Sequence, residues 1–306
     1  MVHSFLAFQK SFEVTTEGGY NLKEELQKDP QRYYNRPNPQ VFPVQTSNDI
    51  LFCRPVVFIS NHQTFLDAPL LAPLIAKLTT SGHPYLWGLD WQNWPFSAGS
   101  ASLLFNHPVP ATIMTLFCGV PVQPKWQAIG ESHPTNILVQ NRSRFLPDMI
   151  EVTKVRKMIL FPEGRLYQDS IEPRDEQGCW TQFDGLKTAP NDDVGQFFTG
   201  FARIVAHTDA LVVPITHMGL DQVQKAKNTD YKFQDCSYGT GADVRIHIGK
   251  PMDFGQAIGD MREKGFSFDD FNAPDTYCSE KKILYREIRD SVRTSVIKGR
   301  DACRGA

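Results

Sequence analysis

An α/β fold is predicted, because apolar runs of strand length alternate along the chain with longer apolar stripes of helical period. The strand-like runs cover residues 55–60, 158–160 and 210–215. A helical stripe lies within residues 194–207. Residues 243–248 alternate between polar and apolar with a period of two, which is typical of a half-buried strand.

A C-terminal helix is predicted from apolar residues that recur every fourth position, from Leu284 through Ile288 and Val292 to Val296. Such a stripe packs a helix onto the sheet. The stripe is surrounded by basic residues, namely Lys281, Lys282, Arg286, Arg289 and Arg293. These form either a solvated face or a face that touches anionic lipid headgroups.

Composition excludes several classes of protein. With 306 residues, 41% of them hydrophobic, the chain is long enough to bury a sizeable core. A formal net charge of −2 and a pI near 6.4 argue against nucleic acid as a partner, since such binders are basic. The 6 cysteines contain no CxxC pair, so neither a zinc site nor a disulfide scaffold is indicated. The N-terminus lacks the features of a secretory signal.

Two segments stand apart from the alternating pattern. Residues 1–48 are mostly polar and contain several prolines, so we expect a short helix near residues 22–28, then an extended connector that wraps the domain formed by residues 49–306. Residues 166–193 are polar and turn-rich, which predicts a long loop. Long loops of this kind are lids or binding elements, or else disordered insertions.

The clearest chemical signal follows the first strand-like run, where His62 precedes Asp67 by five positions. Imidazole is the side chain best suited to remove a proton from an attacking hydroxyl near neutral pH. A carboxylate on the other ring nitrogen fixes the tautomer and orientation of such a base. Residues five apart on a continuous helix do not share a face, so a turn must bring the two together. Pro69 fits a helix that begins just there.

A second motif, Phe161-Pro162-Glu163-Gly164-Arg165, follows the strand-like run at residues 158–160. With His-x4-Asp, it resembles the two main motifs of the glycerophospholipid acyltransferase family. Residues 200–206, 214–221 and 248–251 are similar in spacing to the tafazzin branch, whose members are phospholipid–lysophospholipid transacylases that remodel cardiolipin. The resemblance covers about residues 50–255. It implies one acyltransferase domain with a mixed, largely parallel central sheet flanked by helices.

The resemblance also implies roles for individual residues. His62 is the expected base and Asp67 its orienting partner, while Asn61, Glu163, Gly164 and Arg165 are expected to bind substrate. Gln123 stands where the family offers an arginine to the acceptor phosphate, so Lys125 is the expected replacement cation. No metal and no cofactor is implied.

A membrane-interface hairpin that does not span the bilayer is predicted for residues 91–124, which contain no Asp, Glu, Lys or Arg in a chain that is 22% charged. Its prolines divide it into pieces too short for a transmembrane helix, and Trp is enriched at membrane interfaces. A hairpin buried in the core is the alternative. The residues expected to enter the lipid are Trp91, Trp94, Phe96, Leu103, Leu104, Phe105, Ile113, Met114, Leu116 and Phe117.

These features predict an enzyme that transfers an acyl chain to the free hydroxyl of a lysophospholipid at a membrane surface. The acyl donor is a phospholipid, as in the tafazzin branch, or else acyl-CoA. A monotopic location on mitochondrial membranes follows from the resemblance, with the endoplasmic reticulum or another intracellular membrane as the alternative. Two other classes are an esterase, for which residues 98–102 lack the Gly-x-Ser-x-Gly pattern, and a non-catalytic lipid-binding protein.

Overall fold

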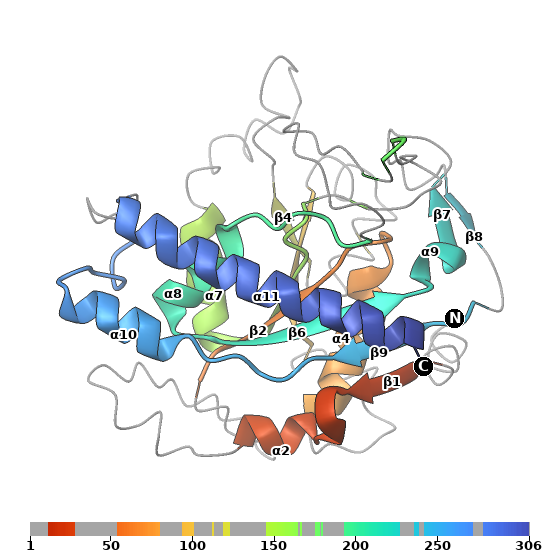
Figure 1. Cartoon of the computed structure of the whole chain (residues 1–306), viewed down its shortest axis with the longest axis horizontal. Helices are drawn as coiled ribbons and strands as arrows, with labels where there is room; N and C mark the ends of the chain where they lie inside the picture. The colour runs from red at the N-terminus through yellow and green to blue at the C-terminus, as the bar shows by residue number, and fades with distance from the viewer. Residues whose placement is uncertain are drawn as a thin grey trace.

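A seven-stranded mixed sheet forms the centre of the computed structural model (Figure 1). The structure describes residues 12–27, 54–79, 94–100, 112, 119–122, 145–164, 166, 175–177, 179, 193–226, 236–238, 242–271 and 278–305. The strands of this sheet, in spatial order, are β1 (Glu13–Thr16), β9 (Arg245–Ile248), β6 (Leu211–Met218), β2 (Val56–Ser60), β5 (Met158–Leu160), β3 (Phe96–Ser100) and β4 (Gly119–Val122).

The sheet is largely parallel. Neighbouring strands from β6 to β4 pair in parallel, β9 pairs antiparallel with β6, and β1 lies parallel to β9 at the edge. A separate antiparallel pair joins β7 (Gln224–Ala226) to β8 (Cys236–Tyr238). The α/β class with a mixed, mostly parallel sheet is therefore confirmed.

Helices cover both faces of the sheet. They are η1 (Glu17–Gly19), α2 (Leu22–Gln27), α4 (Asp67–Thr79), α7 (Phe145–Val155), α8 (Gly200–Thr208), the short α9 (Leu220–Val223), α10 (Gly255–Glu263) and α11 (Ser279–Gly305). The long helix α11 crosses one face and contacts β6, β9 and α8 (Figure 1). Among the described residues, no helix is both long enough and apolar enough to cross a membrane.

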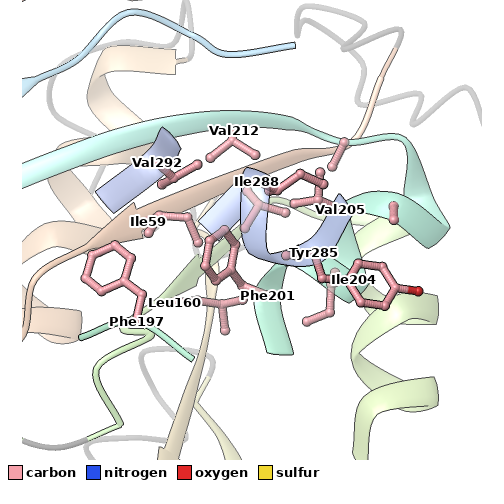
Figure 2. Packing of buried hydrophobic residues seen from close by; sticks show 14 of the residues in the cluster. Ile59, Leu160, Phe197, Phe201, Ile204, Val205, Val212, Tyr285, Ile288 and Val292 are labelled. Atoms are coloured by element: carbon pink, nitrogen blue, oxygen red, sulfur yellow. The ribbon is translucent and has the colours of Figure 1, made fainter. Parts of the chain in front are cut away.

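Side-chain alternation along β2 divides the core in two. Val57 and Ile59 belong to a cluster with residues of α7, α8 and α11, part of which Figure 2 shows around Ile59 and Phe201. Val56 and Phe58 belong to a second cluster with α4 and α2. Because all four are at most 2% exposed, each contributes about 1.5–3 kcal/mol of hydrophobic stabilisation. β2 is thus fixed from both sides, and the loop that follows it starts from a rigid position.

Helix α8 begins at Gly200, later than the periodicity over residues 194–207 predicted. The preceding residues are not helical, and their N–H groups have other partners. The Gly195 N–H donates to Glu163 and the Phe198 N–H donates to the carbonyl of Pro162. Those bonds fix the segment before α8 against the second motif.

The terminal helix is confirmed, but two of its five predicted basic residues point inward. Lys281 is fully buried and its Nζ donates to the Ser267 carbonyl. Arg293 donates to the carbonyls of Val194 and Gly195, at 2.8 Å in both cases. These contacts assign Lys281 and Arg293 to packing rather than to a basic face.

The two ends of the uncharged segment, residues 91–124, lie in the central sheet. β3 pairs with β5 and with β4, and both pairings are parallel. Parallel strands are joined by a crossover, so these ends do not form the two legs of the predicted hairpin. Trp94 is buried and Phe96 is half-buried beside β5. The other predicted membrane residues lie outside the described part of the chain: Trp91, Leu103, Leu104, Phe105, Ile113, Met114, Leu116 and Phe117.

Candidate active site

The candidate site lies where β2 and β5 end. These strands are parallel neighbours, with Ile59 opposite Leu160, so the segments after Ser60 and Leu160 emerge at the same edge of the sheet. Carboxyl ends of parallel strands are the usual place for a binding crevice in open α/β sheets. The two sequence motifs are thereby brought into contact.

His62 and Asp67 form a hydrogen-bonded pair. The Nδ1 of His62 lies 2.9 Å from Oδ2 of Asp67. A carboxylate only accepts, so Nδ1 carries the hydrogen and the lone pair is on Nε2. The imidazole retains 22% of its side-chain exposure, whereas Asp67 has none. The arrangement leaves a partly exposed imidazole held in one tautomer by a buried carboxylate.

A tight turn before α4 makes this pair possible. Asp67 is the first residue of α4, and its N–H donates to the Thr64 carbonyl while the Leu70 N–H donates to that of Leu66. The chain from His62 to Leu66 folds back over the start of the helix, as the position of Pro69 predicts. Residues five apart, which would diverge on a helix, meet here through the turn.

Five donors surround the Asp67 carboxylate. Besides His62, the N–H of Gln63 donates at 2.6 Å, and Thr64 donates through its N–H and its hydroxyl, the latter at 2.5 Å. The fifth is His217, whose Nε2 lies 3.3 Å from Oδ2. Burial alone raises the pKa of Asp67, but its interactions with His217 and then His62 outweigh burial and hold the pKa below its usual range. Asp67 is therefore an anion at neutral pH.

Phe161 and Gly164 shape the other side of the site. The Phe161 ring stacks on the His62 imidazole, with centroids 4.5 Å apart and planes inclined by 25°. Gly164 has a φ of 70°, and a Cβ there would lie 3.0 Å from the Phe198 ring. The positive φ favours glycine, and a larger residue would also push against the Phe198 ring. The motif glycine lets the chain turn beneath Phe198 while Phe161 packs on the base.

Glu163 is bonded to the backbone of His62. It is fully buried, and its two oxygens accept the N–H of His62 at 2.6 Å and the N–H of Gly195 at 2.5 Å. Burial raises its pKa well above the usual value, although the bonds from Gly195 and His62 oppose that shift. In this geometry both oxygens of Glu163 accept backbone hydrogen bonds and position His62, while substrate binding by Glu163 stays a prediction.

Asn61 is also buried, and it joins β2 to β6. Its Nδ2 donates to the His217 carbonyl at 2.9 Å, and its Oδ1 accepts the His217 N–H at 3.0 Å. The sequence predicted substrate binding for Asn61, and that role stays a prediction. His217 was missed as part of the site because the contact depends on the register of β6 beside β2. The alternation that buries Val213 and Ile215 on one face of β6 also places His217 there.

The remaining predicted substrate residues, Arg165 and Lys125, lie outside the described residues, so their roles stay predictions. Within the part of the chain that the structure describes, no group of three or more His, Cys, Asp or Glu side chains is arranged to hold a metal ion. The ionisable and amide side chains that the structure brings together at the site are two histidines, two carboxylates and an amide.

A family model for acyltransferases matches residues 42–218, more than half of the chain, and the chain belongs to that family. The matched region contains His62, Asp67, Glu163 and His217. The protein is accordingly an acyltransferase that moves an acyl group from a donor to an acceptor.

A solved structure that is similar in arrangement is the crystal structure of the 1-acyl-sn-glycerophosphate (LPA) acyltransferase PlsC from Thermotoga maritima. The similarity has a TM-score of 0.40 at 16% sequence identity, and it covers 94% of this chain and 78% of that chain. No curated protein matches the chain in sequence.

Proposed function

We propose that the protein transfers an acyl chain to the free hydroxyl of a lysophospholipid, with His62 as general base and Asp67 as its orienting partner. The observation that carries the proposal is the 2.9 Å contact between a partly exposed imidazole and a fully buried carboxylate. A base that faces solvent on one nitrogen and an anion on the other suits the removal of a hydroxyl proton.

In the proposed reaction, Nε2 of His62 takes the hydroxyl proton as the acceptor oxygen attacks the acyl carbonyl of the donor. The new carbon–oxygen bond forms, and the bond between the acyl carbon and the donor oxygen or sulfur breaks. The proton then passes from His62 to the departing donor group. Asp67 stabilises the imidazolium between these two transfers, since its carboxylate stays ionised and bonded to Nδ1.

The proposed donor is an intact phospholipid, which would make the reaction a transacylation as in the tafazzin branch. Supporting this choice is the order and spacing of residues 200–206, 214–221 and 248–251. The departing group is then a second lysophospholipid. Acyl-CoA is the alternative donor, and a coenzyme A thiolate is the product that would distinguish it.

The test gives the purified protein a radiolabelled lysophospholipid and one donor at a time, either phospholipid vesicles or acyl-CoA. Label should enter diacyl phospholipid with the vesicles alone, and His62→Ala should abolish that transfer. Label incorporated only with acyl-CoA would reject transacylation while leaving acyl transfer intact. Hydrolysis of the donor without labelled product would reject the acyltransferase proposal in favour of an esterase.

Attachment to a membrane surface through residues 101–118 is also part of the proposal, because the acceptor is a lipid and this segment carries no charge. A charged residue placed in hydrocarbon costs about 2.5–3.5 kcal/mol or more. Leu104→Asp and Met114→Asp should therefore reduce flotation of the protein with liposomes, with thermal melts as the check on folding. A folded double variant that still floats would place the attachment elsewhere.

A further inference from the structure

A second imidazole contacts the carboxylate that orients His62. His217 lies on β6 and is fully buried, and its Nε2 is 3.3 Å from Oδ2 of Asp67. The same Nε2 is 2.9 Å from the backbone oxygen of Asn61. Oδ2 of Asp67 is also the atom that accepts the hydrogen of His62. One carboxylate oxygen is therefore shared by two histidines from different strands.

The contacts of His217 determine which ring nitrogen carries its hydrogen. The carbonyl of Asn61 and the carboxylate of Asp67 are both acceptors, so Nε2 is the donor. Nδ1 is buried and has no hydrogen-bond partner among the described residues. An N–H at that position would be a buried donor without an acceptor, which is costly. The geometry therefore fits an imidazole with its hydrogen on Nε2.

Among the described residues, His217 is the donor group at the Asp67 carboxylate that comes from a distant part of the chain. The other donors to its carboxylate come from His62, Gln63 and Thr64, within the same turn. The backbone carbonyl and N–H of His217 also exchange two hydrogen bonds with the side chain of Asn61, the residue before His62. Both ends of the turn between β2 and α4 are thus attached to one residue of the rigid sheet.

Gly219 keeps His217 in this position. It has a φ of 88°, and a Cβ there would lie 2.1 Å from the Asp243 carbonyl oxygen. The chain leaves β6 through this glycine-dependent turn. His217 is therefore fixed on one side by the strand and on the other by a turn that only glycine fits.

We infer that His217 is a positioning residue for acyl transfer, which holds Asp67 through the 3.3 Å contact between its Nε2 and Oδ2 and so sets how strongly Asp67 binds the ring of His62. The inference rests on the proposed roles of His62 and Asp67. It goes beyond them because it assigns a function in the reaction to a strand residue outside both sequence motifs.

Several ionisable groups surround the shared carboxylate and affect its charge. His62 approaches from the loop after β2, His217 from β6 and Glu163 from the loop after β5, while Asp221 on α9 interacts with both His217 and Asp67. Arg293 on α11 acts on Glu163. Among these groups, His217 and His62 both approach Oδ2 of Asp67. Removal of His217 therefore changes the His62–Asp67 pair directly.

Loss of the contact with His217 leaves more of the charge on Oδ2 available to His62. Protonated His62 is then stabilised, and a higher pH is needed to produce the basic form. The acidic limb of the kcat/KM profile should therefore move to higher pH. The expected shift is about one pH unit, the size of one hydrogen bond to a charged group.

The test compares two amides of the same chemistry at position 217. In His217→Gln, the amide nitrogen reaches the place of Nε2, whereas in His217→Asn it reaches only the place of the unpartnered Nδ1. His217→Gln should retain at least about tenfold more kcat than His217→Asn, and only His217→Asn should show the shifted acidic limb. Loss of an outer partner of a metal-bound histidine lowers activity about 10- to 100-fold, and we expect a loss of that order for His217→Asn.

Controls separate positioning from general destabilisation. His247→Gln removes a buried histidine at the neighbouring register of β9, opposite Thr216, and should leave the pH profile unchanged. Thermal melts of all three variants identify loss of folding. If Asn and Gln at position 217 have equal kcat and equal pH profiles, whether high or low, the donor at the Nε2 position has no special role and the inference is wrong.

Failure of this inference is distinguishable from failure of the proposed function. An inactive His62→Ala beside equally active His217→Gln and His217→Asn would reject the role of His217 alone. A fully active His62→Ala would reject the proposed base, and with it the inference.

Discussion

Asp67 and Glu163 are both fully buried carboxylates bonded to His62, yet they hold different parts of it. Asp67 contacts the imidazole, accepts hydrogen bonds from four donor groups and lies 3.3 Å from a fifth, the second imidazole of His217. Glu163 contacts the backbone N–H of His62 and one other backbone N–H. The pKa of Asp67 is lowered, while the pKa of Glu163 is raised well above its usual value.

The difference shows that burial does not by itself decide the charge of a carboxylate. Burial opposes ionisation in both residues, and only at Asp67 do neighbouring groups outweigh it. A carboxylate that orients a histidine ring must stay negative to stabilise the imidazolium. A carboxylate that holds the backbone only needs to accept hydrogen bonds. Each carboxylate has the surroundings that its proposed role requires.

Replacing the carboxylate of Asp67 should have the largest effect in this comparison. In Asp67→Asn, the amide hydrogens face groups that donate, and the hydrogen of His62 loses the acceptor that fixed it on Nδ1. We expect kcat to fall on the order of 10³–10⁴-fold, as it does when the orienting Asp of a hydrolase triad becomes Asn. Steady-state kinetics on the folded variant provide the measurement.

The control for this substitution is Asp209→Asn, at the opposite end of β6. Asp209 pairs with Arg54 in a mostly buried ion pair, at 3.1 Å. Its loss should lower the thermal stability and leave kcat close to the parent value. Equal losses of kcat in the two variants would show that buried charge, rather than orientation of His62, is what activity requires.

Replacing the carboxylate of Glu163 should have a smaller effect, because the imidazole keeps its partner. In Glu163→Gln one oxygen becomes an amide nitrogen, so the N–H of either His62 or Gly195 loses its acceptor. We expect the free energy of unfolding to fall by about 1–3 kcal/mol and kcat by roughly 10- to 100-fold. A raised KM for the lysophospholipid with unchanged kcat would instead support the substrate contact expected from the sequence.

The pH dependence of the free energy of unfolding is the smallest expected effect. It distinguishes Glu163 from Asp67 because the pKa values of the two carboxyl groups shift in opposite directions. Because the folded-state pKa of Glu163 is raised, its contribution to stability is fully present below the usual value of 4.5 and is lost as the pH rises through the raised pKa. Glu163→Gln has no such titration. The free energy of unfolding of Glu163→Gln minus that of the parent should therefore increase from pH 4 to pH 8, as urea denaturation would measure. A difference that stays flat or decreases would contradict the raised pKa.

Much of the fold and the core of the site were predictable from the sequence because their signals are local. The period of the strands and helices gave the α/β class, and the spacing of His62, Asp67 and Pro69 required the turn before a helix. The strand before Phe161 indicated that the second motif would emerge beside the first. In each case the information lies within about ten residues.

The contacts that were missed depend on strand register and on packing between distant segments. His217 reaches Asp67 because β6 lies beside β2 with Ile215 opposite Ser60. Glu163 accepts a hydrogen bond from the N–H of Gly195 because Arg293 holds the segment before α8 in place. β3 and β4 join the sheet although their sequence suggested a hairpin. None of these pairings can be predicted from a single sequence, because each joins segments that lie far apart along the chain.

The central claim is that His62 is the base that removes the proton of the acceptor hydroxyl, and it is tested most directly by the rate of acyl transfer in purified His62→Ala. Thermal melts and liposome flotation establish that the variant is folded and bound. Loss of a general base lowers a rate by typically 10²–10⁴-fold, so we expect kcat to fall by about that factor. A folded His62→Ala that transfers acyl chains at nearly the parent rate would contradict the claim.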